Sequence, residues 1–381
     1  MENVPAYRVR LHGSTGCFCT FAGLLTAQTH AFMKILVLFT ELAEYVLACL
    51  NELAEVSGAE VHVIRYPVNR EAPFQFTGLH PRVVLHDRSL FAENELVDVA
   101  YKLSPQLVMV SGWKDKGYLK VAKAFHGKVP TVLLFDNKWK GGLKQNLASL
   151  ISPFHLRKRF SHCFVPGPEQ AVFARKLGYP PNRILQGFYC CDTGHFARIF
   201  HDTLPAKRAT FPRRLLYVGR YYDFKGITDL WEAFSRLHSF HAEGWELWCL
   251  GTGDLPPAVH PSIKHFGFVQ PRDMPPFLAQ CGVFVMPSRI EPWGVVLHEM
   301  ACAGFPLLAS REVGSAVTFL QAGENGYVFD AGNADALERA LVQMMEKTDA
   351  ELTAMGESSH RLGLTLTTTL WSKKLLGILT T

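Results

Sequence analysis

From Met33 onward, short continuous apolar runs alternate with longer segments that carry helical periodicity. The run "KILVLF" at 34–39 precedes the amphipathic segment 41–56, and "EVHVIRYP" at 60–67 follows it. Similar apolar runs lie at 106–110, 131–135 and 162–167, with helix-like stretches between them. Continuous apolar strands separated by helices predict a parallel sheet that is covered on both faces.

A second alternating series begins near residue 214. Its apolar runs lie at 214–219, 245–251, 263–269, 283–288 and 306–310, with helices expected to start near 225, 273 and 294 and to span 333–347 and 370–379. Between the two series, residues 191–213 are polar and contain Pro205 and Pro212, which predicts an irregular interdomain linker.

At 381 residues the chain is too long for one comfortable core, so two domains are expected. The predicted fold class is α/β, with two Rossmann-like domains whose parallel sheets face each other across a cleft. The first predicted segment is an N-terminal extension at 1–32, either disordered or upstream of the true start, with a signal peptide as the less favoured alternative. The remaining predicted boundaries are a first domain at 33–190, the linker at 191–213, a second domain at 214–360 and a C-terminal helix at 361–381, which has the option of packing back on the first domain. Open α/β sheets bind ligands at the carboxyl ends of their strands, so the cleft is the expected site.

Charge adds one local feature. A net charge of +5 is mild for this length and does not indicate a nucleic-acid binder. No acidic residue lies between Asp136 and Glu169, whereas the basic residues there are Lys138, Lys140, Lys144, Arg157, Lys158 and Arg159. This basic stretch, 138–159, fits peripheral contact with anionic lipid or an anionic acceptor. A solvated surface balanced by acidic residues from elsewhere fits equally well.

The nine cysteines lack metal-ligand spacing, so they are interpreted as reduced thiols of a cytoplasmic protein without a metal site. No run of about 18 apolar residues is present, so a membrane-spanning helix is not predicted.

The apolar run "RLLYVG" leads into "GRYYDFKG", where Gly219 allows a tight turn. Arg220 and Lys225 then bring two cations to the carboxyl end of a strand. Such a pair suits a diphosphate, because arginine grips two oxygens while lysine supplies a point charge. An ordinary charged surface turn is the alternative.

The segment "PSRIEPWGVVLHEMACAGFP" at 287–306 predicts a turn followed by a helix that starts at Gly294 and ends near Gly304. Backbone N–H groups at Gly294, Val295 and Val296 would point into the cleft and hold phosphate. Glu291 precedes the helix, where a plain interaction with the helix dipole competes with a ligand role. Glu299 lies in apolar sequence, and a buried carboxylate needs a partner, either a ribose diol or a group of the protein.

These residues together resemble glycosyltransferase family 4, two-domain enzymes of the GT-B fold that use nucleotide-sugar donors with retention of anomeric configuration. The resemblance is strongest over 215–330 and includes "CDTGHF" at 191–196, which is similar to the family's interdomain segment. It implies that Arg220 and Lys225 bind the donor diphosphate, that Glu291 contacts the transferred sugar, and that amides near Gly294 hold phosphate. It further implies that Glu299 binds the ribose and that Phe268 and Val269 line the base pocket.

The chain departs from the family in its first half. No glycine-rich loop follows the first strand, which leads into "FTELAEY", and no residue matches the family's usual histidine near the sugar. Asp136 and Lys138 are the predicted substitutes on that side.

The expected function is therefore a retaining glycosyltransferase that moves a hexose-type sugar from a nucleotide-sugar to a glycan or lipid-linked acceptor in polysaccharide biosynthesis. The expectation includes no metal or other cofactor and a cytoplasmic location, with peripheral contact at the inner face of the membrane as an option. The alternatives are an epimerase or hydrolase of nucleotide-sugars on the same fold, and a non-catalytic protein that binds nucleotide or glycan. No G-x-G-x-x-G follows a predicted strand, which disfavours a dinucleotide-dependent oxidoreductase.

Overall fold

The computed structural model describes residues 32–68, 73–238 and 244–380, and the predicted extension therefore lies almost wholly outside the described residues. The first sheet has the strand order β3-β2-β1-β4-β5-β6-β7 and the second β10-β9-β8-β11-β12-β13, with parallel pairing throughout. The first sheet is built from β1 (Lys34–Phe39), β2 (Glu60–Arg65), β3 (Val83–Asp87), β4 (Leu107–Ser111), β5 (Thr131–Leu134), β6 (His162–Val165) and β7 (Ile184–Gln186). The second is built from β8 (Arg214–Val218), β9 (Glu246–Leu250), β10 (Ile263–His265), β11 (Val283–Met286), β12 (Leu307–Ser310) and β13 (Gly326–Phe329).

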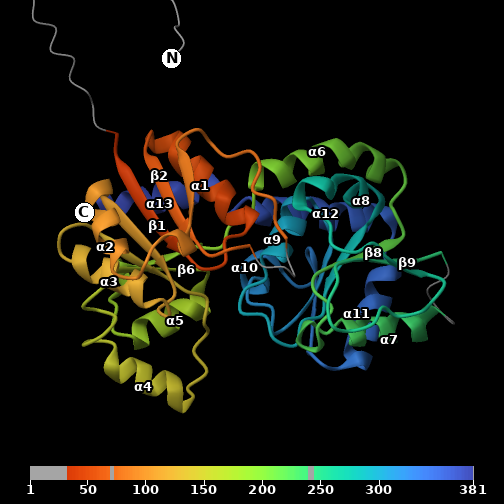
Figure 1. Cartoon of the computed structure of the whole chain (residues 1–381). Coiled ribbons are helices and arrows are strands. Elements are labelled where there is room, and N and C mark those ends of the chain that lie inside the picture. The colour runs from red at the N-terminus through yellow and green to blue at the C-terminus, as the bar shows by residue number, and fades with distance from the viewer. Residues whose placement is uncertain (1–31, 69–72, 239–243, 381) are drawn as a thin grey trace, which may run out of the picture. The chain divides into compact units, whose positions relative to one another are not determined.

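Helices cover both sheets, as Figure 1 shows. The helices of the first half are α1 (Glu44–Ser57), α2 (Glu95–Leu103), α3 (Lys116–Phe125), α4 (Leu143–Ile151) and α5 (Pro168–Lys176). Those that follow are α6 (Thr193–Ala209), α7 (Ile227–His238), α8 (Pro275–Gln280), α9 (Val295–Cys302), α10 (Ala316–Phe319), α11 (Ala334–Met345), α12 (Asp349–Gly363) and α13 (Thr368–Leu376). The 3-10 turns are η1 (Arg88–Leu90), η2 (Pro181–Arg183), η3 (Asp223–Lys225), η4 (Pro271–Asp273) and η5 (Gly377–Leu379).

The prediction of two α/β sheets is confirmed, and the strand order also shows where ligands should bind. In each sheet the order reverses beside the first strand, between β1 and β4 in one and between β8 and β11 in the other. Such reversals open a crevice at the carboxyl ends of the strands. The central strands β4, β5, β6, β11 and β12 are almost completely buried, as their continuous apolar sequences predicted.

The prediction of an irregular segment between the halves is wrong, because residues 193–209 form the helix α6. Asp192 caps the helix by accepting a hydrogen bond from the amide of His195. The positions that α6 buries recur at helical spacing, which the polar composition concealed: Thr193, Phe196, Ile199, Phe200, Thr203 and Lys207. Pro205 lies inside this helix without ending it.

Short or half-exposed elements also escaped the sequence analysis. The strands β3, β7 and β13 have only three to five residues each, and their burial patterns are mixed. The helix α12 was missed as well, although Thr348 and Glu351 form a capping box at its start.

The end of the chain returns to the first half. Trp371 on α13 is fully buried, its indole N–H donates to the carbonyl of Phe188 at 2.8 Å, and its ring packs against Phe164. Thr369 donates to Glu52 on α1. The last helix thus joins a hydrophobic core that includes residues from both halves of the chain.

Within the described ranges, no helix has the length and apolar character needed to cross a bilayer.

The buried Trp371 provides a test of how much this returning helix stabilises the fold. Trp371→Ala should reduce the free energy of unfolding by about 3–5 kcal/mol, because it leaves a large cavity and an unpaired carbonyl. Leu370→Ala on the same helix, where the side chain is more exposed, is the matched control and should cost less than about 1 kcal/mol. Urea denaturation of the three proteins measures both values; equal losses for the two variants would show that α13 does not anchor the fold.

Candidate functional site

A cleft of about 660 Å³ lies between the two halves, at the carboxyl ends of the central strands. It is lined from the second half by Gly219, Arg220, Lys225, Phe268, Val269, Glu291, Gly294, Val295, Val296 and Glu299, and from the first half by Asp136 and others. The structure therefore brings together every residue predicted for the site except Lys138.

Two loops of the second half are tied to each other at the base of this cleft. The carbonyl of Phe224, after β8, accepts from the amides of Arg289 and Ile290, after β11. Arg289 also forms ion pairs with Asp223 at 2.8 Å and with Asp229 at 2.7 Å. Gly226 permits this approach, since its φ is +66° and a Cβ would lie 2.1 Å from the carbonyl oxygen of Pro287.

The linked loops place Lys225 against Glu291, with 2.5 Å between Nζ and a carboxylate oxygen. Both side chains are largely buried. The sequence analysis treated these residues separately and did not predict the ion pair. Arg220 lies on the same loop and its guanidinium stands over the ring of Tyr222. An anion that enters here would meet two cations, one of which is already shared with a carboxylate.

Gly294 starts α9 in a left-handed conformation with a φ of +87°, and a Cβ would lie 2.7 Å from Met286. Among the described residues, none accepts a hydrogen bond from the amides of Gly294, Val295 or Val296. Because these amides line the cleft, they can serve an anionic ligand, and the helix dipole favours such a ligand there.

Glu299 is the most perturbed carboxyl group of the cleft. The residue is only 6% exposed, and no described residue forms a hydrogen bond or ion pair with its side chain. Burial raises the pKa of Glu299 to about 8, with further rises from Glu44 and Asp192 and an opposing effect of His298. A carboxyl group in this setting is short of hydrogen-bond donors, which a ligand with hydroxyl groups can supply.

Phe268 and Val269 lie at one end of the cleft, where a segment of the first half reaches across to them. Phe74 contacts Phe268 edge to face, with 5.8 Å between ring centroids. Arg272 donates to Thr77 and Gln75 of the same segment. The apolar walls for a flat ring system therefore come from both halves of the chain.

The two residues predicted on the first half have different surroundings. Asp136 lines the cleft, accepts a long hydrogen bond of 3.5 Å from Tyr189, and has a pKa raised chiefly by burial. Lys138 does not line the cleft. Its ammonium group pairs with Glu169 at 2.8 Å and donates to the carbonyl of Glu312, so it lies turned away from the ligand space.

The loop after β1, where the glycine-rich segment was absent, still lines the cleft with Glu41, Leu42 and Ala43, followed by Glu44 and Tyr45 of α1. The two glutamates make this wall acidic rather than suited to phosphate. The sequence analysis missed this contribution, as well as Tyr189, whose ring meets Tyr45 edge to face, and Asp192 and Arg272. The β1 loop could have been predicted to line the site, because it follows the end of a parallel strand. Tyr189, Asp192 and Arg272 could be assigned to the cleft only from the three-dimensional fold.

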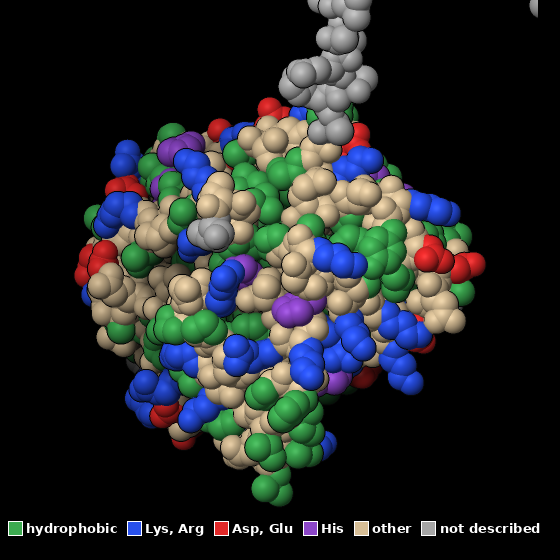
Figure 2. All heavy atoms as spheres, turned by 90° about the vertical axis from the view of Figure 1, so that its left-hand side faces the viewer, with side chains coloured by type: hydrophobic (Ala, Val, Ile, Leu, Met, Phe, Trp, Pro, Cys, Tyr) green, Lys and Arg blue, Asp and Glu red, His purple; other side chains and the backbone are tan. Residues whose placement is uncertain are grey.

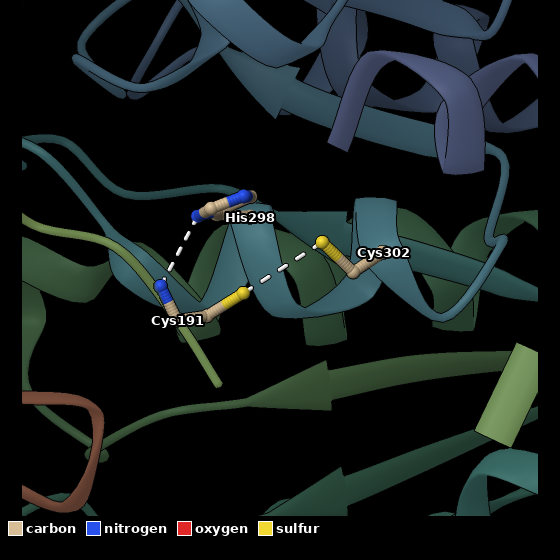
Figure 3. A group of neighbouring side chains, drawn as sticks. All are labelled: Cys191, His298 and Cys302. Atoms are coloured by element: carbon tan, nitrogen blue, oxygen red, sulfur yellow. Dashed lines mark hydrogen bonds between the residues drawn. The ribbon is translucent and has the colours of Figure 1, made fainter. Parts of the chain in front are cut away.

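Behind the cleft lies a buried group formed by Cys191, His298 and Cys302, shown in Figure 3. The amide of Cys191 donates to Nδ1 of His298 at 3.2 Å, and Nε2 of His298 lies 2.8 Å from the carbonyl of Gly363. Both ring nitrogens of His298 therefore have hydrogen-bond partners. Only the two cysteine sulfur atoms of this group would be available to a metal ion. The group joins α9 to the segment that precedes α6 and supports Glu299 from the next position in the chain.

The cleft thus carries two kinds of polar group. Arg220, Lys225 and the free amides at the start of α9 can stabilise phosphate. Carboxylates lie at Glu44, Asp136, Asp192, Glu291 and Glu299, of which Glu291 is paired with Lys225, and hydroxyl groups of a sugar or ribose could donate to them. This arrangement can hold an anionic ligand that also carries several hydroxyl groups.

Residues 212–347 match the model of a family described as glycosyl transferases group 1. The chain is 34% identical over 154 residues to the lipopolysaccharide core biosynthesis glycosyltransferase LpsE of Rhizobium meliloti, covering 38% of this chain and 43% of that protein. It is 26% identical over 193 residues to the O-antigen chain mannosyltransferase B of Escherichia coli, covering 45% and 48%. The matches thus span less than half the length of these relatives.

Solved structures resemble the chain over most of its length. HepE of Anabaena, in complex with UDP and glucose, has a TM-score of 0.69 at 17% identity, covering 91% of this chain and 99% of that one. An E. coli structure bound with UDP-2-fluoro glucose, described as trehalose-6-phosphate, has a TM-score of 0.68 at 9% identity, covering 91% and 98%. At these identities the likeness concerns the fold, which is that of GT-B glycosyltransferases.

Glu299 allows a test by pH. Between about pH 4.5 and 8 the native state binds a proton at Glu299 that the unfolded state has lost, so the free energy of unfolding falls as pH rises. Glu299→Gln removes this dependence. The free energy of unfolding of the variant, relative to that of the unmodified protein, should therefore rise by roughly 2 to 4 kcal/mol from about pH 5 to about pH 9. Urea denaturation at both pH values measures the gain, with the exposed Glu324→Gln as a control for the loss of one carboxylate. A difference that stays constant with pH would mean that Glu299 is not held in its neutral form.

Proposed function

We propose that the protein is a glycosyltransferase that moves a hexose-type sugar from a nucleotide-sugar to a glycan or lipid-linked acceptor. The proposal includes membership of glycosyltransferase family 4 and retention of anomeric configuration. The observation that carries it is the partnerless carboxyl group of Glu299, which lies in the same cleft as Arg220, Lys225 and the free amides at the start of α9. A nucleoside diphosphate carries ribose hydroxyls and a diphosphate in one molecule, so it can engage both groups of residues.

In this proposal the nucleotide-sugar donor binds mainly to the second half of the chain. Glu299 accepts from the ribose hydroxyls, and the base lies between Phe268, Val269 and the facing Phe74. The diphosphate is held by Arg220, Lys225 and the amides of α9. HepE, which is similar in fold, was solved in complex with UDP, and this supports a nucleotide as the ligand.

Charge stabilisation is the main catalytic contribution in this proposal. As the bond from the anomeric carbon to the diphosphate breaks, negative charge grows on the leaving group next to Arg220 and Lys225. Lys225 then interacts with phosphate as well as with Glu291, which becomes available to hydroxyls of the transferred sugar. Because these cations neutralise the diphosphate, the proposal needs no metal ion or other cofactor.

The acceptor approaches from the first half, where Asp136, Tyr45 and Tyr189 line the cleft. Names of the relatives include a lipopolysaccharide core enzyme and an O-antigen chain enzyme, which supports a glycan or lipid-linked acceptor. Asp136 is the predicted residue on this side of the cleft that could position an acceptor hydroxyl.

The same cleft would also suit a nucleotide-sugar hydrolase or epimerase, or a non-catalytic binding protein. Only a transferase needs an acceptor for turnover, so the effect of an acceptor distinguishes these functions. The protein is incubated with a panel of nucleotide-sugars, with and without candidate acceptor glycans, and nucleotide release is followed. Transfer predicts release that rises with acceptor. Release without any dependence on acceptor, or tight donor binding without turnover for every acceptor, would overturn the transferase proposal.

The role of Lys225 can be tested against a matched lysine. Lys225→Ala should lower kcat by roughly 10²- to 10³-fold, because one stabilising charge is removed from the leaving diphosphate. Lys138→Ala is the control, since Lys138 lies outside the cleft, and should change kcat by less than about threefold. Steady-state kinetics with one donor and one acceptor measures both effects. Similar losses for the two variants would contradict the placement of the diphosphate.

A further inference from the structure

The helix α4 presents an apolar face that nothing in the described part of the chain covers. Its members, here called the α4 face, are Leu143 (90% exposed), Leu147 (56%), Leu150 (73%), Ile151 (45%) and Phe154 (73%). The spacing of Leu143, Leu147, Leu150 and Ile151 by three and four residues brings them to one side of the helix, and Phe154 lies in the turn that follows it. No residue of α4 itself is buried.

The α4 face is carried by a well-anchored element. Directly after the helix, Leu156 and Phe160 are buried in the core of the first half, and the hydroxyl of Ser152 donates to the carbonyl of Leu177 at 2.7 Å. In the first turn of the helix, the side chain of Gln145 accepts from the amide of Lys140 and donates to the carbonyl of Lys138. The exposed apolar side chains are therefore presented by an ordered support.

Basic side chains surround the α4 face. Lys140, Lys144, Arg157 and Lys158 are exposed, and no described residue forms an ion pair with any of them. One interpretation of the stretch 138–159 was that acidic residues from elsewhere neutralise its positive charges. Among the described residues, such an ion pair forms only at Lys138, which pairs with Glu169. The remaining charges are left for an external partner.

Figure 2 shows this part of the surface from the side. Hydrophobic side chains form the lowest projection of the molecule, which is where Figure 1 places α4, and Lys and Arg side chains gather directly above them. Apolar tips bordered by cations match the two layers of a lipid surface, in which acyl chains lie beneath anionic headgroups.

We propose that the α4 face and its basic border dock the protein on the surface of a bilayer that contains anionic lipid. The five apolar side chains enter the boundary between headgroups and acyl chains, while the four cations contact the headgroups. A second copy of the chain fits less well, because a symmetric contact through the same patch would bring the two basic borders together.

The position of the α4 face also connects the bilayer with the cleft. Only residues 137–142 separate Asp136, which lines the cleft, from the first residue of the α4 face, a span of at most about 24 Å even when extended. Docking would thus hold the cleft close to the membrane surface, where a lipid-linked acceptor is found. This last step rests on the proposed function, whereas docking itself does not.

Flotation with vesicles tests the proposal without using activity. The full chain should float with vesicles of phosphatidylcholine and phosphatidylglycerol at a ratio of about two to one, and bind at least tenfold less to phosphatidylcholine alone. Raising the salt concentration should weaken binding, since the headgroup attraction is screened. Failure to bind either vesicle would overturn the proposal and leave the glycosyltransferase proposal intact.

Two sets of variants identify the surface. The triple variants Leu143→Gln/Leu150→Gln/Phe154→Gln and Lys144→Gln/Arg157→Gln/Lys158→Gln should each lose binding by at least tenfold, because burial of apolar groups and headgroup attraction both contribute. The matched controls replace exposed residues elsewhere: Leu90→Gln for the first set and Lys102→Gln/Lys123→Gln/Arg339→Gln for the second. Circular dichroism checks that all variants are folded.

Binding that survives in both triple variants would contradict the assignment of this surface. Sedimentation velocity tests the other possible occupant of the α4 face, which is a second copy of the chain. A dimer that the apolar triple variant converts to monomer, together with an absence of vesicle binding, would show that the α4 face joins two copies of the chain instead.

Discussion

A carboxyl group held in an apolar interior without a partner is the constraint on which the second half of the structure depends. Glu299 lies on a short helix whose other buried positions are hydrophobic apart from His298, and no described residue donates a hydrogen bond to its side chain. A folded protein tolerates such a group by keeping it protonated or by binding a ligand that completes its hydrogen bonds. The helix that carries it also begins with free amides at the cleft, so one element supplies both groups that a ligand would contact.

Three contacts hold the chain around this helix. Gln170 of the first half donates to the carbonyl of Pro292, and a Cβ on Gly167 would collide with the ring of Trp293. On the other side of α9, the amide of Cys191 donates to His298. Residues immediately before and after the ligand-facing positions are thus fixed by the first half, which links the shape of the cleft to the packing between the halves. The returning helix α13 strengthens the same arrangement through Trp371.

Much of this fold could be predicted from the apolar runs of the sequence. The central strands β1, β4, β8 and β11 are continuous and hydrophobic, so the reversal points of both sheets fell inside correctly predicted elements. The helix α6 was lost because its buried positions are spaced through polar sequence and it contains Pro205. Local composition could not show that the faces of this helix would be covered by residues far away in the chain.

The site shows the same division. Gly294 and Glu299 could be found from sequence, since a glycine before a helix and a carboxylate in apolar surroundings are local signals. The pairing of Lys225 with Glu291 joins residues 66 positions apart through the contact of two loops, and no local pattern encodes it. Lys138 had the right position after a strand but turns to Glu169, a choice that depends on the neighbouring helix α5.

A structure of the protein crystallised with a nucleoside diphosphate tests the central claim most directly. The account predicts ribose hydroxyls within hydrogen-bond distance of the Glu299 carboxylate, phosphate oxygens on the amides of Gly294 to Val296, and Lys225 in contact with phosphate. A nucleotide bound with its ribose away from Glu299, or one bound outside the cleft, would contradict it.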